Sequence, residues 1–125
     1  MQVVPSRIVR WTISILSLLA LIACERLDDD PDKDRRSRTV AALNLTGHAI
    51  ETYMKDHARL PPEDQSGLSA ALGMNIPLDG WGRSLEYRPV ERDGHPFQLY
   101  SFGPTGQDER GSGANLDYWR LRTAR

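Results

Sequence analysis

An uncharged, apolar run near the start of the chain decides how much of it can fold into a globular domain. Residues 11–23 (WTISILSLLALIA) follow two basic residues, Arg7 and Arg10. A helix that spans a hydrocarbon core needs about 20 apolar residues, so this run is too short for one, but it matches the apolar region of a secretory signal peptide. The sequence therefore predicts that residues 1–23 are a signal peptide and that the rest of the 125-residue chain holds one small domain.

The end of this run, LIAC at residues 21–24, resembles the lipoprotein box of bacterial envelope proteins. The resemblance implies cleavage after the small Ala23 and attachment of a diacylglycerol to the thiol of Cys24. Two or three acyl chains hold a protein stably on a bilayer, whereas one does so only marginally. We therefore expect a lipid-anchored protein that faces the periplasm, and Glu25, where an inner-membrane lipoprotein often has Asp, favours the outer membrane. An uncleaved signal anchor over residues 8–23 is the alternative, which a charge inside that window disfavours.

The composition excludes several other kinds of protein. Cys24 is the only cysteine, so neither a disulfide framework nor a cysteine-based zinc site can form. The chain has 16 Lys+Arg against 17 Asp+Glu, whereas a nucleic-acid-binding face normally shows as an excess of clustered basic residues. We therefore expect the membrane as a partner, through Cys24, and no nucleic acid.

A charged stretch follows the cysteine. Residues 25–38 (ERLDDDPDKDRRSR) contain one proline and one apolar residue, and almost all the others are charged. Such a stretch buries too little surface to offset its conformational entropy, so residues 24–38 are predicted to be a flexible tether. A calcium site on its five aspartates (Asp28, Asp29, Asp30, Asp32 and Asp34) is a less favoured interpretation.

Residues 39–125 are predicted to form an α+β domain. A helix is expected from Thr39 to about Ala58, because residues suited to a buried face recur at three- and four-residue steps: Val40, Leu43, Gly47, Ile50, Met54 and His57. A short second helix is expected over residues 66–72, and three strands near residues 85–90, 97–102 and 116–121. One long helix packed on a small antiparallel sheet would bury both apolar faces. Four aromatic residues are expected to pack in this core or on the sheet: Trp81, Tyr87, Tyr100 and Trp119.

Three segments of this domain together resemble a known family. They are residues 77–88 (PLDGWGRSLEYR), 96–107 (PFQLYSFGPTGQ) and 114–119 (ANLDYW). In this order they are similar to the globular part of the major pseudopilin of type II secretion, the G subunit of the general secretion pathway. The resemblance covers about residues 39–120 and implies a pilin-like fold.

The same resemblance implies a calcium ion in the glycine-rich loop that follows residue 102. Calcium takes six to eight oxygen ligands, usually including several carboxylates. The residues in place to supply them are Asp108, Asn115 and Asp117, whereas Thr105 stands where the family has an aspartate. Calcium is therefore the one candidate cofactor.

The chain departs from the pseudopilin pattern at its start. Pseudopilins begin with a long apolar helix that forms the core of a fibre, and a lipoprotein box with a polar stretch replaces it here. The sequence therefore predicts a non-catalytic, lipid-anchored docking module that binds secretion components or secreted cargo, with an exposed edge strand near residues 116–121 for pairing. The alternatives are a true pseudopilin subunit with an N-terminal membrane helix, and a small periplasmic hydrolase that uses Ser101, His95 and Asp93. The oligomeric state is left open.

Overall fold

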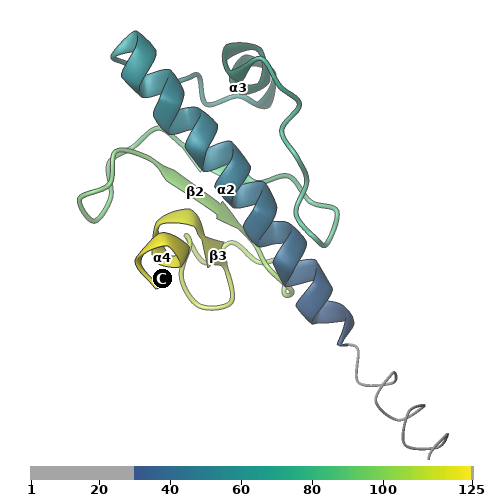
Figure 1. Cartoon of the computed structure of the whole chain (residues 1–125). Coiled ribbons are helices and arrows are strands. Elements are labelled where there is room, and N and C mark those ends of the chain that lie inside the picture. Colours follow the sequence, from purple (N-terminus) through teal and green to yellow (C-terminus); the bar gives the residue numbers. More distant parts are fainter. Residues whose placement is uncertain (1–29, 125) are drawn as a thin grey trace, which may run out of the picture. The chain divides into compact units, whose positions relative to one another are not determined.

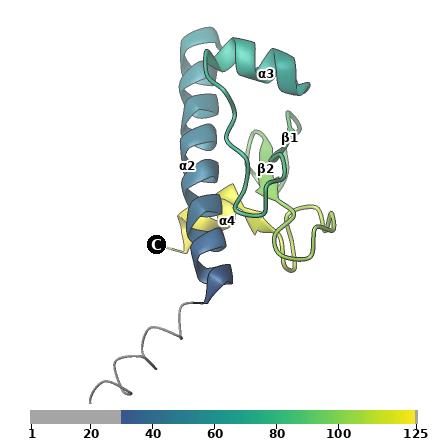
Figure 2. The same cartoon turned by 90° about the vertical axis from the view of Figure 1, so that its right-hand side faces the viewer.

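A long helix packed on a small sheet organises the domain (Figure 1). The structure, a computed structural model, describes residues 30–124. Its elements are α2 (Pro31–His57), α3 (Gln65–Leu72), β1 (Glu86–Arg88), β2 (Gln98–Ser101), β3 (Leu116–Asp117) and α4 (Tyr118–Thr123). Figure 2 shows α2 and the strands as two layers, with α3 beside one end of α2. The predicted α+β class, with one long helix, a three-stranded antiparallel sheet and a short second helix, is confirmed.

Helix α2 begins at Pro31, earlier than the sequence predicts. The prediction of a flexible tether over residues 24–38 is therefore wrong for residues 31–38. Proline suits the first position of a helix, and acidic residues in the first turn are stabilised by the helix dipole. Ion pairs one turn apart also hold this exposed start, with Asp32–Arg35 at 3.6 Å and Asp34–Arg38 at 2.5 Å. High charge predicted a tether here, but the spacing of opposite charges favours a helix.

The face of α2 that turns to the core carries six buried residues: Thr39, Ala42, Leu43, Thr46, Gly47 and Ile50. Leu43, Gly47 and Ile50 were predicted, whereas the prediction for His57 is wrong. His57 lies in the last turn, where its ring is exposed and stacks on Tyr53 at 4.1 Å. A Cβ at Gly47 would lie 2.4 Å from the ring of Tyr118. Glycine at this position therefore lets the ring of Tyr118 lie directly against α2.

Helix α3 has clear signals at both ends. The side chain of Asp64 caps its start by accepting a hydrogen bond from the Gly67 amide at 2.8 Å. Gly73 ends it in a left-handed conformation with φ of 64°, which glycine adopts without strain. The prediction of a short second helix over residues 66–72 is confirmed. Leu68 from this helix is buried in the same core as Leu43 of α2.

The sheet is antiparallel throughout, and β2 lies between β1 and β3. Tyr87 pairs with Leu99 in the first register, and Ser101 pairs with Leu116 in the second. Leu99 is fully buried, and the buried Tyr87 donates a hydrogen bond from its hydroxyl to the Pro61 carbonyl at 2.9 Å. The core thus ties the segment after α2 to the sheet.

The third strand is much shorter than predicted. Strand β3 covers only Leu116–Asp117, and the expected strand over residues 116–121 is wrong beyond that point because α4 follows at once. Asp117 ends the strand: its carboxylate accepts hydrogen bonds from the amides of Trp119 and Arg120, both at 3.0 Å, and so caps the helix. The exposed edge strand expected over these residues as a docking surface is therefore limited to Leu116–Asp117.

Candidate functional site

The turn at Asp79 joins the sheet to the start of α2. One carboxylate oxygen of the buried Asp79 accepts hydrogen bonds from the amides of Trp81 and Arg83, both at 2.9 Å. Its other oxygen accepts a hydrogen bond from the Ser101 hydroxyl at 2.7 Å. At the next residue, the Gly80 amide donates to the hydroxyl of the buried Thr39 at 2.8 Å. The turn is thereby fixed to both the central strand and α2.

The side-chain amide of Asn115 organises the glycine-rich loop, residues 103–115. Its oxygen accepts hydrogen bonds from the amides of Glu109 at 2.9 Å and Gly111 at 3.2 Å. Its nitrogen donates to the carbonyls of Phe102 at 3.0 Å and Gln107 at 2.8 Å. Asn115 is 4% exposed, so one buried side chain satisfies four backbone groups of a segment that lacks regular structure.

Four arginines surround the same loop and donate to it. Three of them donate to backbone carbonyls: Arg83 to Gly103 at 2.8 Å, Arg92 to Arg110 at 2.5 Å and Arg120 to Gly111 at 3.0 Å. The fourth, Arg88, contacts the carboxylate of Asp108 at 3.1 Å. Guanidinium groups therefore occupy carbonyl and carboxylate oxygens that could otherwise serve as metal ligands.

Both oxygens of the Asp108 carboxylate accept hydrogen bonds. The amide of Arg110 and the hydroxyl of Tyr100 both donate to one of its oxygens at 2.9 Å. These two hydrogen bonds, with the charge of Arg88, lower the pKa of the Asp108 carboxyl. Burial, together with the hydrogen bond to Asp108, raises the pKa of Tyr100 to about 12. Asp108 therefore fastens the outer part of the loop to β2 as an ionised group.

The three residues predicted to hold calcium are each engaged in hydrogen bonds within the domain. Asp108 is engaged as above, Asn115 binds the backbone on both sides of its amide, and Asp117 caps α4. Within residues 30–124 no group of three or more His, Cys, Asp or Glu side chains is placed to hold a metal ion. In this arrangement the bonded oxygens of these side chains are occupied, whereas a calcium ion takes six to eight oxygen ligands. Among the aspartates of the charged stretch that were named for calcium, Asp32 and Asp34 pair with arginines.

The candidate hydrolase residues are also not brought together. Ser101 is fully buried and its hydroxyl is bonded to Asp79, whereas His95 lies in the turn before β2, at the opposite end of that strand. The His95 ring stacks flat on Trp119, with centroids 4.4 Å apart. Asp93, beside it, has an exposed carboxylate that pairs with Arg92.

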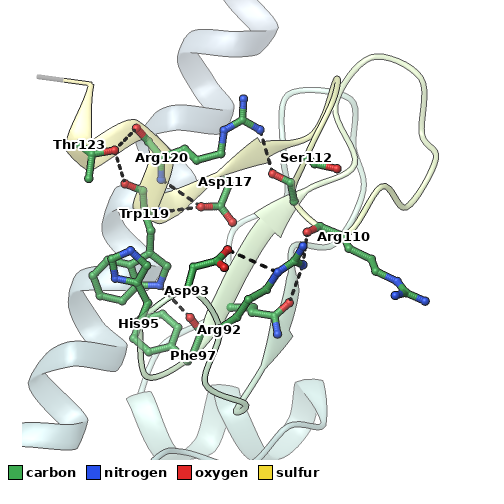
Figure 3. Close-up of a pocket in the computed structure, with 12 residues that line it drawn as sticks. Arg92, Asp93, His95, Phe97, Arg110, Ser112, Asp117, Trp119, Arg120 and Thr123 are labelled. Atoms are coloured by element: carbon green, nitrogen blue, oxygen red, sulfur yellow. Dashed lines mark hydrogen bonds and ion pairs between the residues drawn. The ribbon is translucent and has the colours of Figure 1, made fainter.

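A pocket of about 200 Å³ opens between the turn before β2, the loop and α4 (Figure 3). We call it the arginine pocket; it is lined by Arg92, Asp93, His95, Phe97, Gln98, Arg110, Gly111, Ser112, Asp117, Trp119, Arg120 and Thr123. The indole of Trp119 is fixed by a hydrogen bond to the Phe97 carbonyl at 2.8 Å. The sequence did not predict this pocket, because its residues come from three separate segments and share no local pattern.

Comparison with models of known protein families finds no match, and no curated protein matches the chain. The predicted signal peptide and Cys24 lie outside the described residues. Among the helices that the structure does describe, none is both long enough and apolar enough to cross a membrane.

Proposed function

We propose that this chain is a lipid-anchored, non-catalytic docking protein of the bacterial envelope that is related to the G pseudopilin and serves type II secretion. One observation carries the proposal: the three segments that resemble the pseudopilin meet in a single hydrogen-bonded network. Asp79 of the first segment bonds Ser101 of the second, and Asn115 of the third bonds the Phe102 carbonyl of the second. A long helix packed on a small sheet also supports a pilin-like head.

The anchor is the part of the proposal that rests on the LIAC motif at residues 21–24. Mass spectrometry of the mature protein tests it, and we expect an N-terminal peptide that begins with an acylated Cys24. The variant Cys24→Ser should lose lipid labelling and keep its first 23 residues, because the thiol is the atom that accepts the diacylglycerol. A mature protein that begins with a methylated residue other than Cys24 would instead support a true pseudopilin subunit.

The docking role requires a partner, which is tested separately. The membrane-anchored protein should be purified under mild conditions and its bound proteins identified. Recovery of secretion-channel or inner-membrane platform proteins, or of secreted cargo, supports the role in secretion. Recovery of only cell-wall or envelope-stress proteins contradicts it. Fractionation of the two membranes in the same cells tests the expectation, based on Glu25, that the outer membrane holds the protein.

A further inference from the structure

Two aspartates of the domain are each followed by glycine, in the pairs Asp79-Gly80 and Asp93-Gly94. The side-chain carboxyl group of an aspartate can be attacked by the amide nitrogen of the next residue. A glycine in that position has no side chain to block the approach. The surroundings of the two pairs differ in the features that this reaction requires.

The Asp79-Gly80 pair is held at both reacting groups. The carboxylate of Asp79 is buried and accepts three hydrogen bonds. The Gly80 amide, whose nitrogen would have to attack, donates to the Thr39 hydroxyl at 2.8 Å. A Cβ at Gly80 would collide with the carbonyl of Arg35, so the backbone here is packed against α2 and has little room to rearrange.

The Asp93-Gly94 pair is open at the same groups. The Asp93 side chain is 85% exposed, and its ion pair with Arg92 at 3.7 Å is exposed as well and therefore weak. The pair forms the tip of a two-residue turn, because the backbones of Arg92 and His95 on either side exchange hydrogen bonds of 2.9 Å in both directions. Within residues 30–124, the Gly94 amide donates no hydrogen bond.

The backbone of this turn also favours the reaction. Asp93 has φ of 51° and Gly94 has φ of 81°. Left-handed conformations are uncommon for residues other than glycine, so the backbone of Asp93 loses little when it rotates out of this one. Such a rotation brings the free Gly94 nitrogen to the carboxyl carbon of Asp93.

We propose that Asp93 is a site of spontaneous conversion to isoaspartate, whereas the fold protects Asp79. The Gly94 nitrogen attacks the neutral carboxyl group of Asp93 and forms a C–N bond to its carbon. One water leaves, made of the carboxyl hydroxyl group and the amide proton, and a five-membered succinimide ring remains. Water then breaks one of the two bonds between the ring nitrogen and a carbonyl carbon. Opening at the side-chain carbon restores aspartate, and opening at the main-chain carbon gives isoaspartate, whose backbone runs through Cβ and whose carboxylate is on Cα.

Isoaspartate adds one atom to the backbone of the turn. The two hydrogen bonds between Arg92 and His95 then cannot keep their present geometry, and His95 is released from its flat stack on Trp119 (Figure 3). The conversion therefore changes one wall of the arginine pocket. It depends neither on the lipid anchor nor on a role in secretion.

Peptide mapping of the full chain in uncharged detergent tests the proposal. A glutamate-specific protease separates the two pairs into the peptides 64–86 and 92–109. After prolonged incubation of the folded protein at mildly acidic pH, we expect peptide 92–109 to acquire a second form of equal mass. Electron-transfer fragmentation identifies this form as isoaspartyl by a cleavage between Cα and Cβ. Peptide 64–86 should stay in one form, and in concentrated urea both peptides should convert at similar rates.

Two results would overturn the proposal. The first is a peptide 92–109 that stays unchanged in the folded protein and converts only in urea, because the turn would then protect Asp93. The second is a peptide 64–86 that converts as fast as peptide 92–109 without urea. In that case the hydrogen bonds of the Asp79-Gly80 pair would give no protection.

One variant assigns the signal, because peptide 92–109 also contains Asp108. Asp93→Glu keeps the charge but would need a six-membered ring, so the second form should disappear, and its persistence would contradict the proposal. In the purified isoaspartyl protein the NMR signal of the Trp119 indole should shift, because the His95 ring no longer lies 4.4 Å from it. The Ser101 amide, in the other turn's network, should keep its signal. An unchanged Trp119 signal would contradict the release of His95.

Discussion

Replacing Asn115 should destabilise the domain, because its side chain holds the glycine-rich loop together. Asn115→Ala removes four hydrogen bonds, and each is worth about 0.5–1.5 kcal/mol net. One of the four is fully buried and the other three are part-buried, so water can satisfy some of the freed backbone groups. We therefore expect a loss of about 3 kcal/mol in the free energy of unfolding. For a domain of this size that lowers Tm by roughly 12–24 °C.

Thermal and urea unfolding followed by circular dichroism measure this loss. Asn44→Ala is the matched control, because Asn44 is a half-buried asparagine on α2 with no side-chain hydrogen bond within the described residues, and it should change stability by about 0.5 kcal/mol or less. Asn115→Asp separates the two halves of the amide: it keeps the acceptor but cannot donate to Phe102 and Gln107, so it should also destabilise.

Two results would refute the reasoning. The first is a loss of less than about 1 kcal/mol in Asn115→Ala, which would mean that the loop is held by other contacts. The second is a Tm of the unaltered protein that rises with millimolar calcium and falls with a chelator. That result would mean that an ion, and not the Asn115 amide, organises the loop.

Further predictions concern packing, the Asp79 turn and pH. Although Ala favours helices, Gly47→Ala should lower the free energy of unfolding, measured in urea, by about 1–3 kcal/mol, because its Cβ would lie 2.4 Å from the Tyr118 ring. Adding Tyr118→Leu to the same chain should restore part of this loss. Asp79→Ala should lower the free energy of unfolding by about 3 kcal/mol in the same measurement, because it leaves two amides and the Ser101 hydroxyl without their acceptor. Ser101→Ala should lower it less, because only one of these hydrogen bonds is lost. Burial raises the pKa of Tyr100 and of Tyr118 from 10.0 to about 12, so stability from keeping these phenols neutral is present below pH 10 and lost as pH rises towards 12. Their tyrosinate absorbance should therefore appear near pH 12, and its appearance near pH 10 in a still-folded protein would contradict this.

The elements with periodic or capping signals could be predicted from the sequence. Leu43 and Ile50 lie on the buried face of α2 as expected, and Gly73 ends α3. The prediction of the third strand was wrong because alternation over a few residues does not distinguish a strand from a short helix. The contact that ends the strand and begins α4 is the Asp117 cap, which the prediction did not consider. The start of α2 was missed for a similar reason, because the composition of a charged stretch was given more weight than the spacing of its charges.

The candidate site was less accessible to sequence reasoning. Asn115 was expected as a metal ligand, but its amide instead bonds groups up to 13 residues away in the chain. The arginines that donate to the loop come from separate segments, so only the folded chain brings Arg92 and Arg120 to adjacent carbonyls. Long-range pairing of this kind leaves no local periodicity in the sequence.

Because α2 begins at Pro31, an acylated Cys24 would be joined to the head by residues 25–30 alone. Six residues reach at most about 20 Å when fully extended, whereas a linker through residue 38 would reach about 50 Å. Under the proposed anchoring, the flexible part of the linker would therefore be less than half as long as the sequence predicts.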